Sequence, residues 1–245
     1  MQVERRARIK RAPARLMAAT ASLAAALAQG CSISPMPEPP AEQPTVDLGS
    51  VTTKLPHGTN EPVTVEGGPG AASPPGAIVR VFNLDTADPP AESVVGSDGS
   101  FTIELNLDVG QEGRIQVLAE TQRSSPIDFV AVGNGQPPAL ATRPLADCLL
   151  LEPALELDAA MGSAVTVSSQ CPSAVTIDSP VVRRLVPGFQ VGTGGSWPAV
   201  LGSGDSLSVS VEFQASPGTL EEIFFIQAAA PQQDRRPVTV FPAAG

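Results

Sequence analysis

The chain has 245 residues, of which 42% are hydrophobic and 16% are charged, and its formal net charge is −10. This acidic balance argues against nucleic acid as a partner, because a nucleic-acid interface needs Lys and Arg to displace counterions. The hydrophobic fraction is too high for a disordered chain. Together, 26 prolines and 22 glycines favour many short strands joined by turns.

Residues 1–30 have the composition of an export signal. Six basic residues precede a 13-residue apolar run from Leu16 to Ala28. This run is shorter than the roughly 20 residues that a membrane-spanning helix needs, so we predict a cleaved signal peptide over residues 1–30. Without it, nine basic residues face 24 acidic ones, as expected of a solvated acidic surface.

The apolar run ends at a cysteine, in the sequence Leu27-Ala28-Gln29-Gly30-Cys31. This stretch resembles the signal of bacterial lipoproteins, in which a cysteine after a small residue is lipidated and becomes the mature N-terminus. The resemblance implies lipidation of Cys31, a membrane contact through that lipid and a place in the cell envelope. Ser32 after the cysteine resembles the sorting pattern for the outer membrane. The alternative is a plain secretory leader with an incidental cysteine.

Proline dominates the stretch that follows Cys31. Five prolines fall between Ser32 and Ser50, and such a composition favours the extended polyproline II conformation at about 3.1 Å per residue. We therefore predict that residues 31–50 are the lipidated cysteine and a tether.

The next stretch, residues 51–132, alternates apolar and polar residues in short runs. Examples are Ala77–Phe82, Ser100–Leu105 and Arg114–Glu120, separated by Gly, Pro and Asp-Gly turns. Alternation predicts strands with one buried face and one wet face. The order "PPGAIVRVFN", "VVGSDGSFTIEL", "GRIQVLAE" resembles a bacterial immunoglobulin-like repeat, which implies a β-sandwich.

Residues 133–144, "GNGQPPALATRP", interrupt this pattern and are predicted to be a linker to a second domain over residues 145–245. In "SLSVSVEFQA", Leu207, Val209, Val211 and Phe213 are predicted to face inward. The stretches "CLLLEPALELDAAMGSAVTVSSQCPSAVTI" and "LGSGDSLSVSVEFQASPGTLEEIFFIQ" resemble the immunoglobulin-like domain named after abnormal-spindle and hydin proteins. The predicted fold is therefore all-β, with two immunoglobulin-like sandwiches that have separate cores.

With Cys31 assigned to lipid, Cys148 and Cys171 form an even pair in an oxidising compartment. We predict a disulfide between them, with Cys148 opening the first strand of the second domain and Cys171 ending the strand that begins near Ser163.

Few residues suggest catalysis. The single histidine, His57, lies between a proline and a glycine, and there is no Gly-x-Ser-x-Gly elbow. The pair Glu221-Glu222 is interpreted as a charged strand edge that discourages edge-to-edge pairing. Asp85, Asp88 and Asp98 could offer oxygen ligands to calcium, but they lack EF-hand spacing. We therefore expect no enzyme activity, no cofactor and no metal site.

Trp197 is the only tryptophan in a chain without tyrosine. It could contact a ligand, or it could cap the core of the second sandwich. We expect a cell-envelope lipoprotein that acts as a structural, adhesive or scaffolding module with an unknown envelope protein or glycan as partner. The alternative is a binding module for a small ligand or glycan that uses second-domain loops such as Val191–Val200.

Overall fold

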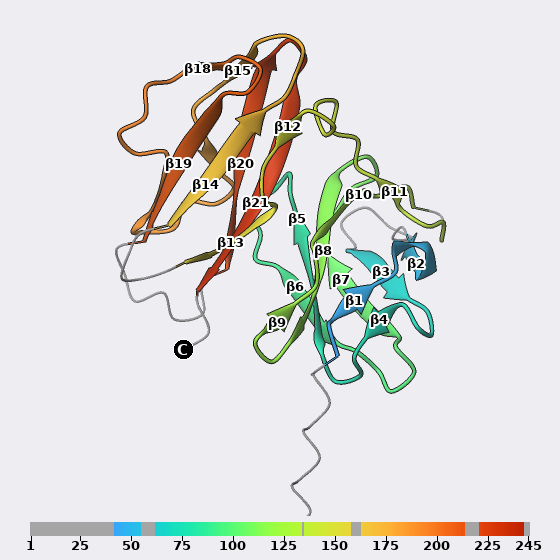
Figure 1. Ribbon diagram of the computed structural model, residues 1–245. Coiled ribbons are helices and arrows are strands. Elements are labelled where there is room, and N and C mark those ends of the chain that lie inside the picture. The colour runs from blue at the N-terminus through green and yellow to red at the C-terminus, as the bar shows by residue number, and fades with distance from the viewer. Residues whose placement is uncertain (1–41, 55–61, 134, 158–162, 214–220, 243–245) are drawn as a thin grey trace, which may run out of the picture. The chain divides into compact units, whose positions relative to one another are not determined.

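The computed structural model describes residues 42–54, 62–133, 135–157, 163–213 and 221–242 (Figure 1). The predicted signal peptide, Cys31 and the tether up to residue 41 lie outside this part of the chain. The described residues are all-β, and their only helical element is the short 3-10 turn η1 (Leu48–Ser50). Within them, no helix is long and apolar enough to cross a membrane.

Two sheets form the first sandwich. The smaller one has the strand order β2 (Val51–Lys54), β3 (Val63–Gly67), β7 (Phe101–Leu105), and we call it outer sheet 1. The larger one, inner sheet 1, has the order β11 (Ala139–Leu140), β10 (Ile127–Val130), β8 (Glu112–Ala119), β5 (Ile78–Asn83), β6 (Ala91–Val94), with β9 (Gln122–Arg123) beside β8. A separate pair joins β1 (Thr45–Val46) to β4 (Ala72–Ser73).

The second sandwich also has two sheets. Inner sheet 2 has the order β13 (Ala154–Leu157), β21 (Asp234–Pro242), β20 (Glu222–Ala230), β15 (Val175–Ile177), β18 (Ala199–Leu201), with β16 (Val181–Val182) beside β20. Outer sheet 2 has the order β12 (Leu149–Leu150), β14 (Ser163–Ser169), β19 (Ser206–Phe213), β17 (Phe189–Val191). The predicted all-β, double-sandwich fold is confirmed.

Each sandwich buries the alternating apolar residues of its two sheets. Val65, Val81 and Ile115 belong to one buried cluster, while Val209 and Phe224 belong to another. In β19, Val209 and Val211 are buried, and Leu207 and Phe213 are half-buried against the same core, as the alternation predicted. The short strand β11 continues inner sheet 1 within the stretch predicted to be a linker.

The prediction of a wet face fails for the inner sheets. On β5 and β8, the residues that point away from the first core include Phe82, Arg114 and Gln116, and each is at most 2% exposed. On β20, Ile223 and Phe225 likewise point away from the second core and are buried. These two outward faces cover one another, so polar positions that alternation assigns to solvent lie inside the protein.

A glycine opposite a phenylalanine recurs in both sheets of the first sandwich. Gly67 pairs with Phe101, and Gly113 pairs with Phe129. A Cβ added at Gly67 would lie 2.2 Å from the Phe101 ring, and one at Gly113 would lie 2.4 Å from the Phe129 ring. The glycines therefore provide the space in which the two rings lie across the sheets.

Gly67→Ala is expected to lower the free energy of unfolding by about 1–3 kcal/mol, because the Phe101 ring must leave its position. Gly68→Ala is the matched control, since its added Cβ has only an ordinary contact of 3.7 Å with the Ser50 carbonyl oxygen. Chemical denaturation of both variants measures the difference. Equal loss in the two would contradict the role of the ring.

Candidate functional site: the junction between the sandwiches

The faces of inner sheet 1 and inner sheet 2 meet through a small apolar cluster. Phe82 and Leu84 of the first sandwich pack with Ile223 and Phe225 of the second, and all four are at most 4% exposed. Each sandwich has its own core, as expected, but this third cluster draws its residues from both halves of the chain and was not expected from the sequence.

Arg114, on β8, is the centre of the polar part of the junction. Its Nε and Nη2 atoms donate to the two carboxylate oxygens of Asp128, at 2.6 and 3.1 Å. The same guanidinium donates across the junction to the hydroxyl of Thr239 at 2.8 Å and to the carbonyls of Pro237 and Pro153 at 2.8 and 3.0 Å. All of its charge-bearing nitrogens are thus bonded, which is how a buried guanidinium becomes acceptable.

Arg183 makes the reverse connection, from the second sandwich to the first. Its Nη1 donates to the backbone carbonyls of Asn83, Thr86 and Asp88 at 3.3, 3.0 and 2.7 Å. Its Nη2 lies 3.1 Å from a carboxylate oxygen of Glu222, whose side chain is fully buried. One cation therefore holds the β5–β6 loop of the first sandwich against β20.

Glu221 is the second acidic residue of this site. It forms ion pairs with Arg80 and Arg123 of the first sandwich, and only 3% of its side chain is exposed. The interpretation of Glu221-Glu222 as an exposed strand edge is therefore wrong. The physical reason is that β20 lies inside its sheet, between β21 and β15, and that four arginines neutralise the pair: Arg80, Arg123, Arg183 and Arg184.

Arg235, on β21, closes the other side of the junction. Its Nη2 donates to Asp85 at 2.6 Å and to Glu112 at 3.0 Å, both in the first sandwich. Asp85 is therefore engaged in an ion pair. Asp88 accepts from Thr86 and Asn106, and Asp98 accepts from Ser100 in its turn. The structure does not bring these three aspartates together as a ligand set.

The electrostatics at Asp128 reflect this environment. Burial by itself would raise the pKa of the carboxyl, but the charges and hydrogen bonds of Arg114 and Arg143 outweigh it and hold the pKa below the ordinary value. The depressed pKa means that the ionised form stabilises the fold above the unfolded-state pKa of about 3.9. This contribution is lost as the pH falls through the folded-state value.

Asp128→Asn is accordingly expected to flatten the dependence of unfolding free energy on pH in the acid range. The measurement is urea denaturation at a series of pH values below about 5, where the carboxyl changes its protonation. Asp205→Asn, at an exposed turn of the second sandwich, is the control. An unchanged slope in Asp128→Asn would contradict the assignment.

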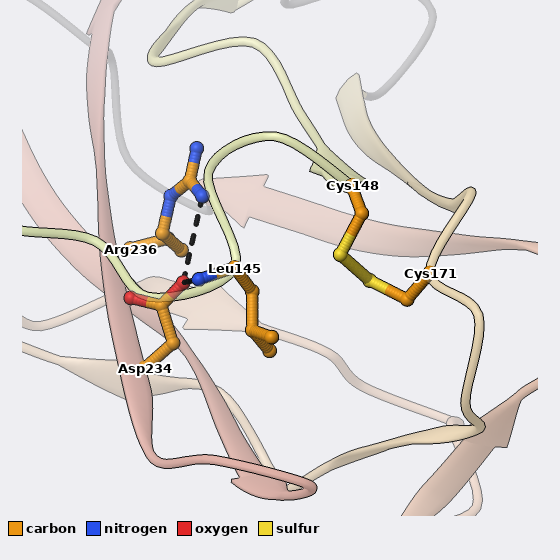
Figure 2. The surroundings of a disulfide bond; sticks show 5 residues. All are labelled: Leu145, Cys148, Cys171, Asp234 and Arg236. Atoms are coloured by element: carbon orange, nitrogen blue, oxygen red, sulfur yellow. Dashed lines mark hydrogen bonds and ion pairs between the residues drawn. A yellow bond between two sulfur atoms is a disulfide. The ribbon is translucent and has the colours of Figure 1, made fainter.

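The predicted disulfide is present. Cys148 and Cys171 are bonded, with their Cα atoms 4.7 Å apart. Cys148 directly precedes β12 and Cys171 follows β14, and these strands pair with each other, so the prediction that the cysteines meet at one end of the sandwich is confirmed. Figure 2 also shows Asp234, whose carboxylate accepts from the backbone N–H of Leu145 at 3.1 Å.

Trp197 is a partly buried side chain that packs against the second core. Its indole N–H donates to the carbonyl of Gly192 at 3.2 Å, within its own loop. A Cβ added at Gly195 would lie 2.8 Å from the indole nitrogen. These contacts fit a residue that caps the core better than one that presents its ring to a ligand.

The described residues contain no group of three or more His, Cys, Asp or Glu side chains that could hold a metal ion. His57 and Cys31 lie outside the described residues. The residues that sequence reasoning missed are the junction arginines, above all Arg114 and Arg183. A usable signal was the run Ile223–Ile226, which has no polar position and so indicates a strand buried on both faces.

Comparison with known proteins adds little to this picture. No family model and no curated protein matches the chain. Among solved structures, the chain is similar to one described as "Biofilm associated protein - BSP domain", with 14% sequence identity and a TM-score of 0.25. The match covers 83% of this chain and 30% of that one, so the chain spans less than a third of the structure that it matches.

Proposed function

We propose that this chain is a cell-envelope lipoprotein that acts as a scaffolding module, in which two sandwiches serve as one stiff body. The observation that carries the proposal is the junction. Arg114, Arg183, Arg235 and Glu221 each bond across it. Domains that move relative to one another usually meet through small, hydrated interfaces. The junction between the two sandwiches is instead buried, and its charges are paired.

The disulfide supports the location outside the cytoplasm. Stable disulfides form in oxidising compartments such as the bacterial periplasm and cell surface, and Cys148–Cys171 is buried on its Cys171 side, which is 1% exposed. The proposal of an envelope location also rests on the leader and on Cys31, which are features of the sequence.

A stiff body is favoured over a ligand-binding module centred on the loop Val191–Val200. The single tryptophan of that loop packs on the core and binds its own loop backbone. It therefore lacks the free ring that a stacking platform for a sugar or peptide needs.

Hydrogen exchange on the full chain tests the stiff junction. The amides of β8 and β21 are expected to exchange with the same opening free energy, because either strand can open only when the junction opens. Clearly different opening free energies for the amides of β8 and β21 would contradict the proposal that the two sandwiches form one stiff body.

The proposed lipid anchor leads to a second testable prediction. Cys31→Ser should move the protein from the membrane fraction to the soluble fraction, since the proposal assigns all of the anchorage to lipid on that residue. Metabolic labelling with a fatty-acid analogue should mark the wild type and leave the variant unmarked. Membrane retention of an unlabelled wild type would exclude the anchor and leave the stiff body untouched.

A further inference from the structure

A hollow of about 340 Å³ lies on inner sheet 2, at the end of the hairpin that joins β20 to β21. Its walls include Asp178, Gln227, Ala229, Gln233 and Arg235. This volume is at the lower end of the range of small-molecule sites, about 300–1,000 Å³. The hollow therefore has room for one small ligand.

A break in the sheet shapes the hollow. Thr176 pairs with Ala230 and Ile177 pairs with Ala228, so Ala229 has no partner on β15. Such a bulge leaves its extra residue out of the ladder and redirects the neighbouring side chains. The small side chain of Ala229 also leaves the space open.

The polar side chains of the hollow are available for a ligand. Asp178, Gln227 and Gln233 make no side-chain hydrogen bond to the other residues that the structure describes, although Asp178 is tied to Gln227 through its backbone N–H at 2.9 Å. The carboxylate offers only acceptors, and each amide offers both an acceptor and donors. Together these three groups could bind neighbouring hydroxyl groups of one ligand.

The charges around the hollow exclude other ligand classes. Arg235 is bound by Asp85 and Glu112, so its charge is already neutralised and an anion gains little from it. The side chain of Asp234, which also lines the hollow, is fully buried: its Oδ2 accepts from the backbone N–H of Leu145 and from Arg236, and its Oδ1 has no hydrogen-bond partner among the described residues. Asp178 is then the single carboxylate of the hollow that is not buried, which is too few for a metal ion.

We propose that this hollow binds a neutral sugar residue, free or at the end of a glycan. Its hydroxyl groups both donate and accept, as the lining of one carboxylate and two amides requires. This inference is independent of the proposed scaffolding role, because a stiff body needs no ligand in the hollow.

The test is a titration of the ¹⁵N-labelled full chain, followed by NMR, with methyl glucoside, methyl mannoside and N-acetylglucosamine as probes. A ligand with so few contacts is expected to bind with a Kd of about 1 mM. At least one probe should shift the amide signals of Gln227, Ala229 and Gln233 in a saturable way.

Variants locate the site. Asp178→Ala should raise the Kd at least about 10-fold, the usual effect of losing a hydrogen bond to a charged group. Gln233→Ala should weaken binding in the same direction. Gln190→Ala is the matched control, because Gln190 is an exposed glutamine on β17 of the opposite sheet, and it should leave the Kd unchanged.

Three results would overturn the proposal. The first is the absence of saturable shifts with all three sugars. The second is an unchanged Kd in both Asp178→Ala and Gln233→Ala. The third is an equal shift of the same signals by phosphate or by a simple diamine, which would mean that charge and not hydroxyl groups determines what binds.

Discussion

Arg114→Met is expected to lower the free energy of unfolding by about 3 kcal/mol, the usual loss when one partner of a buried ion pair is removed. The variant leaves Asp128 with Arg143 as its partner and removes the guanidinium that donates to the Thr239 hydroxyl and to the carbonyls of Pro237 and Pro153. Guanidinium chloride denaturation measures the loss.

Two comparison variants test whether the loss comes from the buried guanidinium of Arg114. Arg114→Lys keeps the charge but loses the planar set of donors, so it should recover only part of the stability. Lys54→Met removes a cation from the exposed pair with Glu66 and should cost less than about 1 kcal/mol. A loss in Arg114→Met no larger than that in Lys54→Met would mean that the junction contributes little.

Replacing both Cys148 and Cys171 by Ala is expected to remove about 3 kcal/mol, since their bond closes a loop with a sequence separation of 23 residues. The sequence alone predicts that only the second sandwich would melt earlier. The shared cluster of Phe82, Leu84, Ile223 and Phe225 changes this expectation. We now expect both sandwiches to lose stability together.

Proteolysis during thermal melting can follow the two sandwiches separately. Cleavage sites in the first and second halves should become accessible at the same lowered temperature in the double variant. An early transition confined to residues beyond 145 would show that the junction does not couple the two halves. Wild-type protein treated with reductant provides a check that the effect comes from the bond.

Local alternation was enough to predict most of the strands. The runs that became β3, β7, β14 and β19 each have one face in a core and one face that is at least partly open to solvent, so their pattern has period two. The disulfide was also predictable, because it needs only two remaining cysteines and a plausible pair of strands.

The junction was not predictable from the same pattern. Arg80, Arg114 and Glu221 occupy positions where a charged side chain normally meets solvent, and nothing local distinguishes an arginine that contacts water from one that contacts a second sheet. The partners of Arg114 lie up to 125 residues away in the sequence. Pairing at this distance depends on how the two sandwiches dock, which no short stretch of sequence encodes.

The distance between Arg114 and Thr239 also constrains the order of folding. A chain that is synthesised from its N-terminus completes inner sheet 1 well before β21 exists, and the bond between them spans 125 residues. During that interval Phe82 and the Arg114 guanidinium lack their partners from the second half, and exposed surface of this kind is the condition under which partly made proteins aggregate. Successful biogenesis therefore depends on keeping the first half apart from its neighbours until its own second half arrives.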